Sequence, residues 1–321
     1  MTLTVLITQP IHPEAVVGLR AAGARVRLLD SPEPVGGSRL AEAAAGADVL
    51  ITLLTDTVDA GVFRANPGLR LVANVAVGHD NIDLAAARAA GVLVTNTPGV
   101  LTEATADHTM ALLLSCARRV AEGDRQLREG LFTGWTLLQE PMGSDVTGRT
   151  LGVVGMGRIG LAVARRASLG FGMPLLYSGH RVVPAAAELG ARRVPLDELL
   201  AAADFITLHA PLTPETRHLI DDRALRLCKP SAILVNTSRG PLVDEAALAR
   251  ALAGGLLAGA ALDVFEHEPA VHPELLARTE RVLLTPHLGS ATDSTRRRMS
   301  ALAVASVVAL IEGREPANRV G

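Results

Sequence analysis

Three side chains suited to acid–base chemistry and anion binding follow short apolar runs of the sequence. Arg239 ends the run AILVNTSR, His287 ends VLLTPH, and Glu268 lies in the loop after Asp263, which ends AGAALD. A guanidinium can hold a carboxylate by two parallel hydrogen bonds, and an imidazole can deliver a proton when a carboxylate keeps it oriented and charged. We therefore predict that these residues take part in the reduction of a 2-keto acid beside a nicotinamide. Arg239 would bind the substrate carboxylate, His287 would protonate the keto oxygen, and Glu268 would keep the imidazole of His287 oriented and charged.

Each of these residues also has an ordinary structural interpretation. An arginine after a strand is usually solvated or caps a helix, and a histidine after Thr-Pro often only satisfies a turn. The catalytic hypothesis therefore depends on their occurring together. Other residues near Glu268 could suggest a metal site, namely Glu266, His267, His272 and Glu274. Because this proline-rich stretch has no helical His-x-x-x-His pair, we expect no metal there.

A glycine pattern, Gly155-x-Gly157-x-x-Gly160, interrupts the sequence TLGVVGMGRIG between a β-branched apolar run and a helical pattern. In a dinucleotide-binding turn, the first glycine permits the tight turn, the second lets the backbone approach a pyrophosphate, and the third lets helix and strand pack closely. Alone, the pattern is also compatible with an ordinary Gly-rich turn. The strand before it and the helix after it supply the required context and predict a dinucleotide site.

The choice of dinucleotide is predicted from the segment PLLYSGHR. An NAD-binding domain usually has an Asp or Glu at the end of its second strand, where it binds the ribose hydroxyls, but this chain has Ser178. His180 and Arg181 follow, so a guanidinium that would attract a 2′-phosphate replaces a carboxylate that would repel it. NADP(H) is therefore favoured over NAD(H). The alternative is that Arg181 is merely solvated after a strand.

The elements that must position these residues alternate between strand and helix patterns. In the first hundred residues TVLIT, RVRLL, DVLITLL, LRLVANVAVG and VLVTN are strand patterns, separated by helical ones. The alternation is interrupted at Pro98. We then expect one long helix over 102–130 and an irregular stretch over 132–147. Further strand and helix units continue to about Pro286, and a last helix is predicted over 291–313.

These patterns predict an α/β fold of two doubly wound domains, one inserted into the other. A Rossmann-type NAD(P)-binding domain is expected over 99–287, and a flavodoxin-like substrate-binding domain over 1–98 and 288–321. Ligands of an α/β enzyme bind in a crevice at the carboxyl ends of the strands, where Arg239 and His287 are expected.

The composition agrees with a two-domain enzyme and argues against other classes. The chain has 321 residues, 49% of them hydrophobic, and a net charge of −2. Its 31 basic residues are scattered, so no nucleic-acid partner is expected. Cys116 and Cys228 are too few for a disulfide framework and are interpreted as core thiols in a reducing compartment. Because neither a signal-peptide pattern nor a membrane-spanning apolar stretch occurs, we expect a cytoplasmic protein without a membrane partner.

A series of motifs, in order and across nearly the whole chain, resembles those of the D-isomer-specific 2-hydroxyacid dehydrogenase family. They are VGHDNID, TEATADHTMALLL, GMGRIG, HAPLTPETRHLI, LVNTSRGPLVDEAAL, LDVFEHEP and TPHLGSAT. The resemblance implies that Arg239, Glu268 and His287 form a catalytic triad. It also implies that Asp263 lies near the nicotinamide carboxamide.

The same resemblance implies which residues bind the two ligands. The cofactor-binding residues would be Thr105, Gly155, Gly157, Arg158, Ile159, Gly160, Ser178, His180, Arg181, Pro211, Thr216, Thr237, Ser238, Arg239, Asp263, His287 and Gly289. The substrate-binding residues would be Leu54, Val77, Gly78, Trp135, Arg239 and His287. The backbone at Val77 and Gly78 would meet the substrate carboxylate.

Within the family, the chain is most similar to the glyoxylate/hydroxypyruvate reductase branch. That branch shares the Tyr-Ser-Gly segment with its downstream arginine, and Gly-Ser-Ala-Thr after the histidine. The resemblance implies glyoxylate and hydroxypyruvate as substrates and a homodimer, in which a tryptophan reaches the partner's pocket. Trp135 matches that position by spacing, although it could be a core residue. His108 stands where the family often has an aromatic or apolar residue, so we expect it to pack or to line the pocket.

Two alternatives remain open at this point. Another dehydrogenase of the same family, using D-lactate, D-glycerate or 3-phosphoglycerate, would share these motifs. A transcriptional corepressor with this fold would use the nucleotide as an assembly switch. The corepressor is disfavoured because the chain has no long disordered tail.

Overall fold

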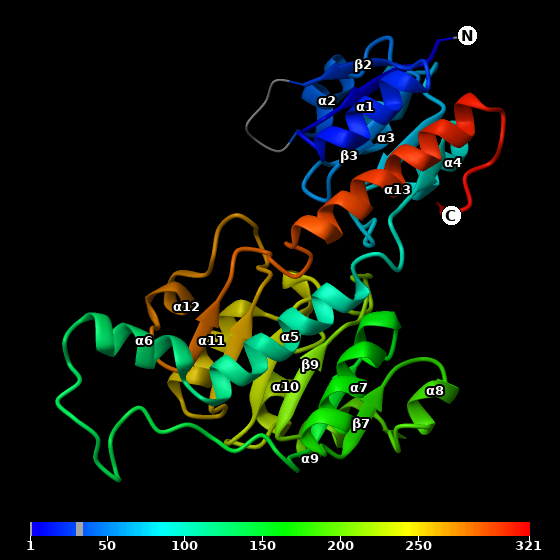
Figure 1. Cartoon of the computed structure of the whole chain (residues 1–321). Coiled ribbons are helices and arrows are strands. Elements are labelled where there is room, and N and C mark those ends of the chain that lie inside the picture. The colour runs from blue at the N-terminus through cyan, green and yellow to red at the C-terminus, as the bar shows by residue number, and fades with distance from the viewer. Residues whose placement is uncertain (1, 30–34) are drawn as a thin grey trace. The chain divides into compact units, whose positions relative to one another are not determined.

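The computed structural model describes residues 2–29 and 35–321, which form two compact units (Figure 1). Unit 1 comprises Met1–Leu101 and Ala291–Gly321, and unit 2 comprises Thr102–Ser290. Unit 2 is thus inserted into unit 1 along the chain. In the part of the chain that the structure describes, no helix combines the length and the apolar character needed to cross a membrane.

Unit 1 contains a six-stranded sheet with the order β13-β5-β4-β3-β1-β2. Its strands are β1 (Thr4–Ile7), β2 (Arg25–Leu28), β3 (Val49–Thr52), β4 (Leu71–Asn74), β5 (Leu93–Thr95) and β13 (Arg319–Val320). The first five are parallel in the flavodoxin-like order, whereas β13 pairs antiparallel with β5. The predicted flavodoxin-like fold is confirmed. The short edge strand β13 was not predicted.

The helices of unit 1 pack on this sheet. They are α1 (Pro13–Ala21), α2 (Gly37–Ala43), α3 (Ala60–Ala65), α4 (Leu84–Ala89) and α13 (Asp293–Ile311). The side chains of Asp59 and Asp83 cap α3 and α4 by accepting bonds from backbone N–H groups of the first turn, which defines where these helices begin. The predicted last helix is confirmed as α13, which packs on α1 (Figure 1) and on β4.

Unit 2 contains a parallel seven-stranded sheet with the order β12-β11-β10-β9-β6-β7-β8. Its strands are β6 (Leu151–Val154), β7 (Leu175–Ser178), β8 (Arg192–Arg193), β9 (Phe205–Leu208), β10 (Ile233–Asn236), β11 (Gly259–Leu262) and β12 (Val282–Leu284). Every residue of β6, β9, β10 and β11 is buried, as expected for a parallel sheet covered on both faces. The strand order is that of a Rossmann fold with one strand added at the edge, so the predicted fold is confirmed.

Two apolar cores cover the two faces of this sheet. The helical elements are α5 (Thr102–Ala117), α6 (Val120–Arg128), α7 (Arg158–Phe171), α8 (Pro184–Ala187), α9 (Leu196–Ala202), α10 (Asp222–Leu227), the 3₁₀ turn η1 (Gly240–Leu242), α11 (Glu245–Ala253) and α12 (Pro273–Ala277). On one face, Leu113 of α5 and Val163 of α7 pack with Val153. On the other, α9 and α11 contribute to the core around Leu234. The sheet is thereby fixed between two layers, and only its strand ends can carry a site.

The single helix expected over 102–130 is wrong, because the chain breaks between α5 and α6 at Arg119, whose φ is 52°. The returning chain ends α5: Ser144 N–H donates to the carbonyl of Ala117 at 2.8 Å. The Arg119 guanidinium binds Glu122 at 2.5 Å and Glu140 at 2.8 Å, which stabilises the break. The sequence ARRVAEGDRQLR is mostly polar, which also suits the exposed end of a continuous helix, so the local pattern gave no sign of the break. The predicted irregular stretch that follows is confirmed.

The glycine turn joins β6 to α7. Gly155 has a φ of 94°, and a Cβ there would lie 2.6 Å from the backbone nitrogen of Ala210. A Cβ on Gly160 would lie 2.2 Å from the carbonyl oxygen of Gly155. Gly157, which precedes the first turn of α7, differs because nothing lies within 4 Å of a Cβ built there. The first and third glycines are therefore required by packing, and the second leaves open space at a helix N-terminus.

We predict that Gly157→Ala and Gly160→Ala separate ligand binding from stability. Gly157→Ala should fold normally, since alanine in place of glycine before a helix costs at most about 1 kcal/mol. It should weaken dinucleotide binding about tenfold or more, because a methyl group would enter the space that a pyrophosphate needs. Gly160→Ala should instead lose about 1–3 kcal/mol of stability by overpacking.

Thermal unfolding and a fluorescence titration with NADPH measure the two effects. Gly157→Ala binding the dinucleotide as tightly as the wild type would contradict the assignment.

Candidate active site

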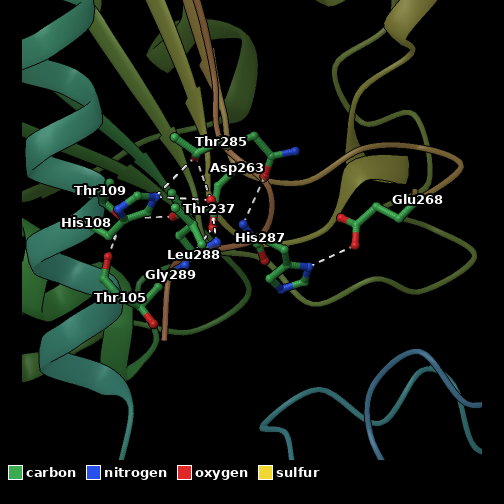
Figure 2. Close-up of polar contacts among 12 residues, drawn as sticks. Thr105, His108, Thr109, Thr237, Asp263, Glu268, Thr285, His287, Leu288 and Gly289 are labelled. Atoms are coloured by element: carbon green, nitrogen blue, oxygen red, sulfur yellow. Dashed lines mark hydrogen bonds and ion pairs between the residues drawn. The ribbon is translucent and has the colours of Figure 1, made fainter. Parts of the chain in front are cut away.

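His287 and Glu268 are in direct contact at the carboxyl ends of β12 and β11. The Nδ1 atom of His287 lies 2.9 Å from Oε2 of Glu268 (Figure 2), and the two side chains are 25% and 27% exposed. An ionised carboxylate can only accept hydrogen bonds, so Nδ1 carries the hydrogen that is donated. The other ring nitrogen, Nε2, is left to exchange a proton with a ligand. The structure therefore brings together these two predicted residues in the geometry that their predicted chemistry needs.

The Glu268 carboxylate is held on both oxygens. Its second oxygen, Oε1, accepts the backbone N–H of Phe265 at 3.0 Å, so the side chain folds back over its own loop. Because the Glu268 side chain is already restricted by this bond, it loses little further conformational entropy when it orients the imidazole of His287.

Asp263, at the end of β11, binds the backbone that carries His287. The carbonyl of Asp263 accepts the N–H of His287 at 2.9 Å. Its carboxylate accepts the N–H of Leu288 at 2.7 Å and that of Gly289 at 2.8 Å. These bonds hold His287 at a φ of 53°, a left-handed conformation that residues other than glycine seldom adopt. The position of the candidate proton donor is thus set by the aspartate.

Two more donors complete the environment of the Asp263 carboxylate, which is fully buried. The hydroxyl of Thr285 donates to Oδ1 at 2.6 Å, and Nε2 of His108 lies 3.1 Å from the same oxygen (Figure 2). Burial alone would raise the pKa of Asp263, but the hydrogen bonds from His108, Thr285 and Leu288, together with the charge of His108, hold it below its ordinary value. The carboxylate is therefore ionised at neutral pH.

The role of His108 was not recognised from the sequence. It was expected to pack in its helix or to line a pocket, whereas the structure places its ring against the Asp263 carboxylate. The two residues are separated by 155 positions in the chain. Because His108 is one of several polar residues of α5, its residue type alone did not indicate such a partner.

Arg239 follows β10 in a turn that neighbouring groups hold closely. The side chain of Asn236 accepts the N–H of Ser238 at 3.1 Å and donates to the carbonyl of Arg239 at 2.8 Å. The next residue, Gly240, packs so tightly that a Cβ would lie 1.9 Å from the backbone of Phe265. The turn that carries Arg239 therefore rests directly on the loop that carries Glu268.

Four predicted cofactor-binding residues lie around the Asp263 network. The hydroxyl of Thr237 lies 2.8 Å from that of Thr109, which donates to the carbonyl of Thr105 at 2.8 Å. A Cβ on Gly289 would lie 3.4 Å from the side chain of Thr105. Figure 2 shows Thr105, Thr237, Asp263 and Gly289 gathered at one end of the sheet.

The remaining cofactor-binding candidates also follow strands of unit 2. Gly155, Gly157, Arg158, Ile159 and Gly160 follow β6, and Pro211 and Thr216 follow β9, where the Thr216 hydroxyl donates to the Pro211 carbonyl at 2.7 Å. Ser238 follows β10, where its hydroxyl donates to the carbonyl of Ala210 at 2.7 Å. The sheet order changes direction between β6 and β9, which is where open α/β sheets bind ligands.

The segment expected to choose between dinucleotides follows β7. Ser178 is the last residue of that strand, and His180 and Arg181 are exposed in the loop after it. Arg193 of β8 also reaches this loop: its Nε donates to the carbonyl of Gly179 at 3.0 Å. Sequence reasoning missed Arg193 because only strand pairing brings it beside Ser178. A guanidinium therefore contacts the loop that follows Ser178.

The predicted substrate residues of unit 1 follow neighbouring strands. Leu54 comes after β3, and Val77 and Gly78 come after β4. The carbonyl of Val77 accepts the side-chain N–H of Asn96 at 2.7 Å, and that of Gly78 accepts from Asn74 at 2.9 Å. These two bonds fix the orientation of the backbone that was predicted to meet a carboxylate.

Trp135 lies in the irregular segment after α6 and is 75% exposed. The structure does not bring it to the side chains around His287, and its exposure excludes the alternative of a core position. Glu266, His267, His272 and Glu274 lie close to Glu268 in the sequence. Among the described residues, no group of three or more His, Cys, Asp and Glu side chains could hold a metal ion.

Comparisons with known proteins agree with this geometry. Residues 110–289 match the family model described as D-isomer specific 2-hydroxyacid dehydrogenase, NAD binding domain. A glyoxylate reductase of Thermococcus onnurineus is 46% identical over 320 residues, covering 98% of this chain and 95% of the relative. A glyoxylate reductase of Korarchaeum cryptofilum is 53% identical over 277 residues, covering 85% and 82%.

Among solved structures, the TT0316 protein of Thermus thermophilus has a TM-score of 0.91 at 45% identity, covering 99% of this chain and all of that one. An NADPH-dependent glyoxylate/hydroxypyruvate reductase of Sinorhizobium meliloti, in complex with NADP and malonate, has a TM-score of 0.89 at 33% identity, covering 100% and 97%. Motifs, fold and relatives agree, so the chain belongs to the D-isomer-specific 2-hydroxyacid dehydrogenase family of NAD(P)-dependent oxidoreductases.

Proposed function

We propose that this protein reduces small 2-keto acids, glyoxylate and hydroxypyruvate, to 2-hydroxy acids with NADPH. The observation that carries the proposal is the 2.9 Å contact between His287 Nδ1 and Glu268 Oε2, because it leaves Nε2 as the proton donor. Relatives named glyoxylate reductase, at 46% and 53% identity, support this choice of substrate.

The chain offers a fitting site for the dinucleotide. The space beside Gly157 suits a pyrophosphate at the N-terminus of α7, and Thr105, Asp263 and Gly289 would surround the nicotinamide end. The bound reduced nicotinamide supplies the hydride. The protein has to supply a proton, bind and orient the substrate, and provide an environment that favours hydride transfer.

In this mechanism Arg239 binds the substrate carboxylate by its planar fork and so orients the keto group. Protonated His287 donates from Nε2 to the keto oxygen as negative charge develops there. Glu268 stabilises the positive imidazole before the transfer and keeps the ring oriented afterwards. Leu54, Val77 and Gly78 of unit 1, and Trp135, remain predicted substrate-binding residues.

We predict that His287→Ala lowers the turnover number by about 10² to 10⁴, since a positioned proton donor contributes about that much. NADPH binding should survive, because the backbone bonds of residue 287 do not need the ring. Glu268→Gln should keep weak activity but lose it at a lower pH than the wild type, since the protonated imidazole loses its carboxylate partner. Turnover measured across pH, with NADPH binding measured separately, tests both.

His12→Ala is the control, because His12 lies at the start of unit 1's helix α1 and its nearest acidic partner, Asp293, is 3.9 Å away. That variant should behave as the wild type. If His287→Ala kept more than half of the wild-type rate, His287 would not be the acid.

We further propose that NADP(H) is preferred over NAD(H). Ser178 offers a small hydroxyl where a carboxylate would repel the 2′-phosphate, and Arg181 and Arg193 offer guanidinium groups beside it. The Sinorhizobium meliloti relative, which is described as NADPH-dependent, supports this preference.

We predict higher catalytic efficiency with NADPH than with NADH, by about tenfold to a hundredfold. One charge-assisted hydrogen bond to the phosphate is worth about 1.5–3 kcal/mol, which corresponds to that ratio. Ser178→Asp combined with Arg181→Ala should reverse the preference by providing an acceptor for the ribose hydroxyls. Steady-state kinetics with both cofactors at one saturating keto acid measure the ratio.

Arg192→Ala is the control for the loss of an arginine in Arg181→Ala, because Arg192 is also exposed but pairs with Glu198 at 2.7 Å. It should leave the cofactor ratio unchanged. Equal or better efficiency of the wild type with NADH would refute the preference without affecting the dehydrogenase assignment.

We also propose that the protein is a homodimer. Residues 120–142, which we call the apolar arm, expose large apolar side chains that would be covered by a second copy. These side chains are Val120, Leu127, Leu131, Phe132, Trp135, Leu137, Leu138 and Met142. Trp135 would then reach the partner's substrate.

We predict that Leu137→Asp combined with Leu138→Asp yields a folded monomer, because charges at two positions that are 79% and 78% exposed disrupt only an interface. Leu169→Asp on α7 is the control, since Leu169 is 75% exposed but lies outside the arm. Sedimentation velocity gives the mass of each species. A wild-type monomer at micromolar concentration would refute the proposal.

A further inference from the structure

Glu245 is a buried carboxylate that the mechanism above does not use. It is the first residue of α11, and only 5% of its surface is exposed. Its Oε1 accepts the backbone N–H of Glu266 at 2.6 Å, and its Oε2 accepts that of His272 at 3.2 Å. Both oxygens are thus bound by backbone amides, which is an uncommon use of a charge that is costly to bury.

The two amides lie at the two ends of one loop. Residues 266–272 leave the end of β11 and return to α12, which packs on α11. Glu268 lies inside this loop. Within it, Ala270 N–H donates to the carbonyl of His267 at 2.8 Å, which narrows the tip. One side chain therefore closes the base of the loop from which Glu268 reaches His287.

Other contacts make the base rigid on the remaining sides. The Glu266 carboxylate lies 2.6 Å from Nε2 of His218 and 3.2 Å from Arg217. The backbone of Phe265, next to Glu266, supports Gly240 and donates to Glu268. The position of the Glu268 carboxylate consequently depends on the two ends of the loop. Glu245 binds the backbone N–H group at each of these ends.

We propose that Glu245 is a positioning residue for the proton donor: it holds loop 266–272 so that Glu268 stays against Nδ1 of His287. This inference rests on the proposed function, in which His287 and Glu268 act together. Among the titratable and charged groups, Glu266, His267 and His272 belong to the loop itself, and His218 and Arg217 bind Glu266. Asp263, which His108 also contacts, accepts the backbone N–H groups of Leu288 and Gly289 that follow His287.

Glu245→Gln is the sharpest variant because it changes almost no volume. A glutamine offers one oxygen and one NH₂ group, so one of the two backbone N–H groups would face a donor instead of an acceptor. That end of the loop should open, and the contact between Glu268 and His287 should loosen. We expect the turnover number to fall about tenfold to a hundredfold, as it does when catalytic groups are displaced by a small distance.

The experiment compares turnover across pH for the wild type, Glu245→Gln, Glu268→Gln and the double variant. We expect Glu245→Gln to lose activity at a lower pH than the wild type, in the same direction as Glu268→Gln, with the KM for the keto acid within about twofold. In the double variant, Glu245→Gln should add little to the loss that Glu268→Gln already causes, because both act through one contact.

Asp244→Ala is the matched control. Asp244 caps the same helix by accepting the N–H of Ala247 at 2.8 Å, so its loss should lower thermal stability while the pH profile stays unchanged. If Glu245→Gln behaves like this control, its role is only structural and the inference is overturned. Glu245→Asp, which keeps the charge but retracts it by one methylene, provides a second test if the glutamine variant does not fold. It should give a smaller shift in the same direction.

The two levels of the hypothesis fail separately. If Glu268→Gln itself leaves the pH profile unchanged, the pairing with His287 is wrong, and the inference about Glu245 falls with it. If Glu268→Gln shifts the profile and neither variant of Glu245 does, the proposed function stands and only the role of Glu245 is refuted.

Discussion

The buried charge of Asp263 is the constraint on which the site of unit 2 depends. Removing a carboxylate from water costs several kcal/mol unless donors replace the lost hydration. Here the donors are the N–H groups of Leu288 and Gly289, the hydroxyl of Thr285 and the ring of His108. Because two of these donors belong to the backbone just after β12, satisfying the charge also fixes the path of the chain. The left-handed conformation of His287 is a consequence of this arrangement.

Buried polar side chains also hold the backbone of other loops at this edge of the sheet. A buried polar side chain from one element binds backbone groups that a strand has left unpaired, as Asn236 does for the turn carrying Arg239. Unit 1 follows the same rule, since the fully buried Asp56 accepts the N–H of Leu53 at 2.8 Å. Backbone groups near a buried edge must find partners, so loops that lack ladder bonds obtain order from side chains. The loops can therefore have well-defined and different conformations, although the strands that they follow have the same regular hydrogen-bonding pattern.

Much of this architecture could be predicted from local sequence. Apolar runs of four or five residues define parallel strands, and the glycine spacing marks the turn between β6 and α7. The resemblance of motifs also pointed to His287 and Glu268, which the structure brings into contact. What failed was the helix across Arg119, because its break depends on Ser144 N–H reaching the carbonyl of Ala117 from a distant segment.

The side chains that were missed share one property: each acts on a part of the chain that is distant in sequence or reached only through folding. His108 binds a carboxylate across 155 positions, Arg193 binds the loop after β7 through strand pairing, and Glu245 binds a loop 21 to 27 residues later. Their residue types gave little warning, because a lone histidine, arginine or glutamate at those positions is compatible with an exposed surface. Polar partnerships between distant segments require the fold to be known first.

The close contact of Gly240 with the backbone of Phe265 makes the Arg239 turn and the Glu268 loop into a single mechanical piece. Any side chain at position 240 would push the two loops apart, so neither can be lengthened, shortened or exchanged without the other. Loop grafting between relatives would therefore have to transfer both segments together. Under the proposed function, libraries intended to alter the range of accepted substrates are better directed at unit 1, where the proposed substrate-binding residue Leu54 follows β3. The residues that select the substrate could in this way change during evolution faster than the two coupled loops that carry Arg239 and Glu268.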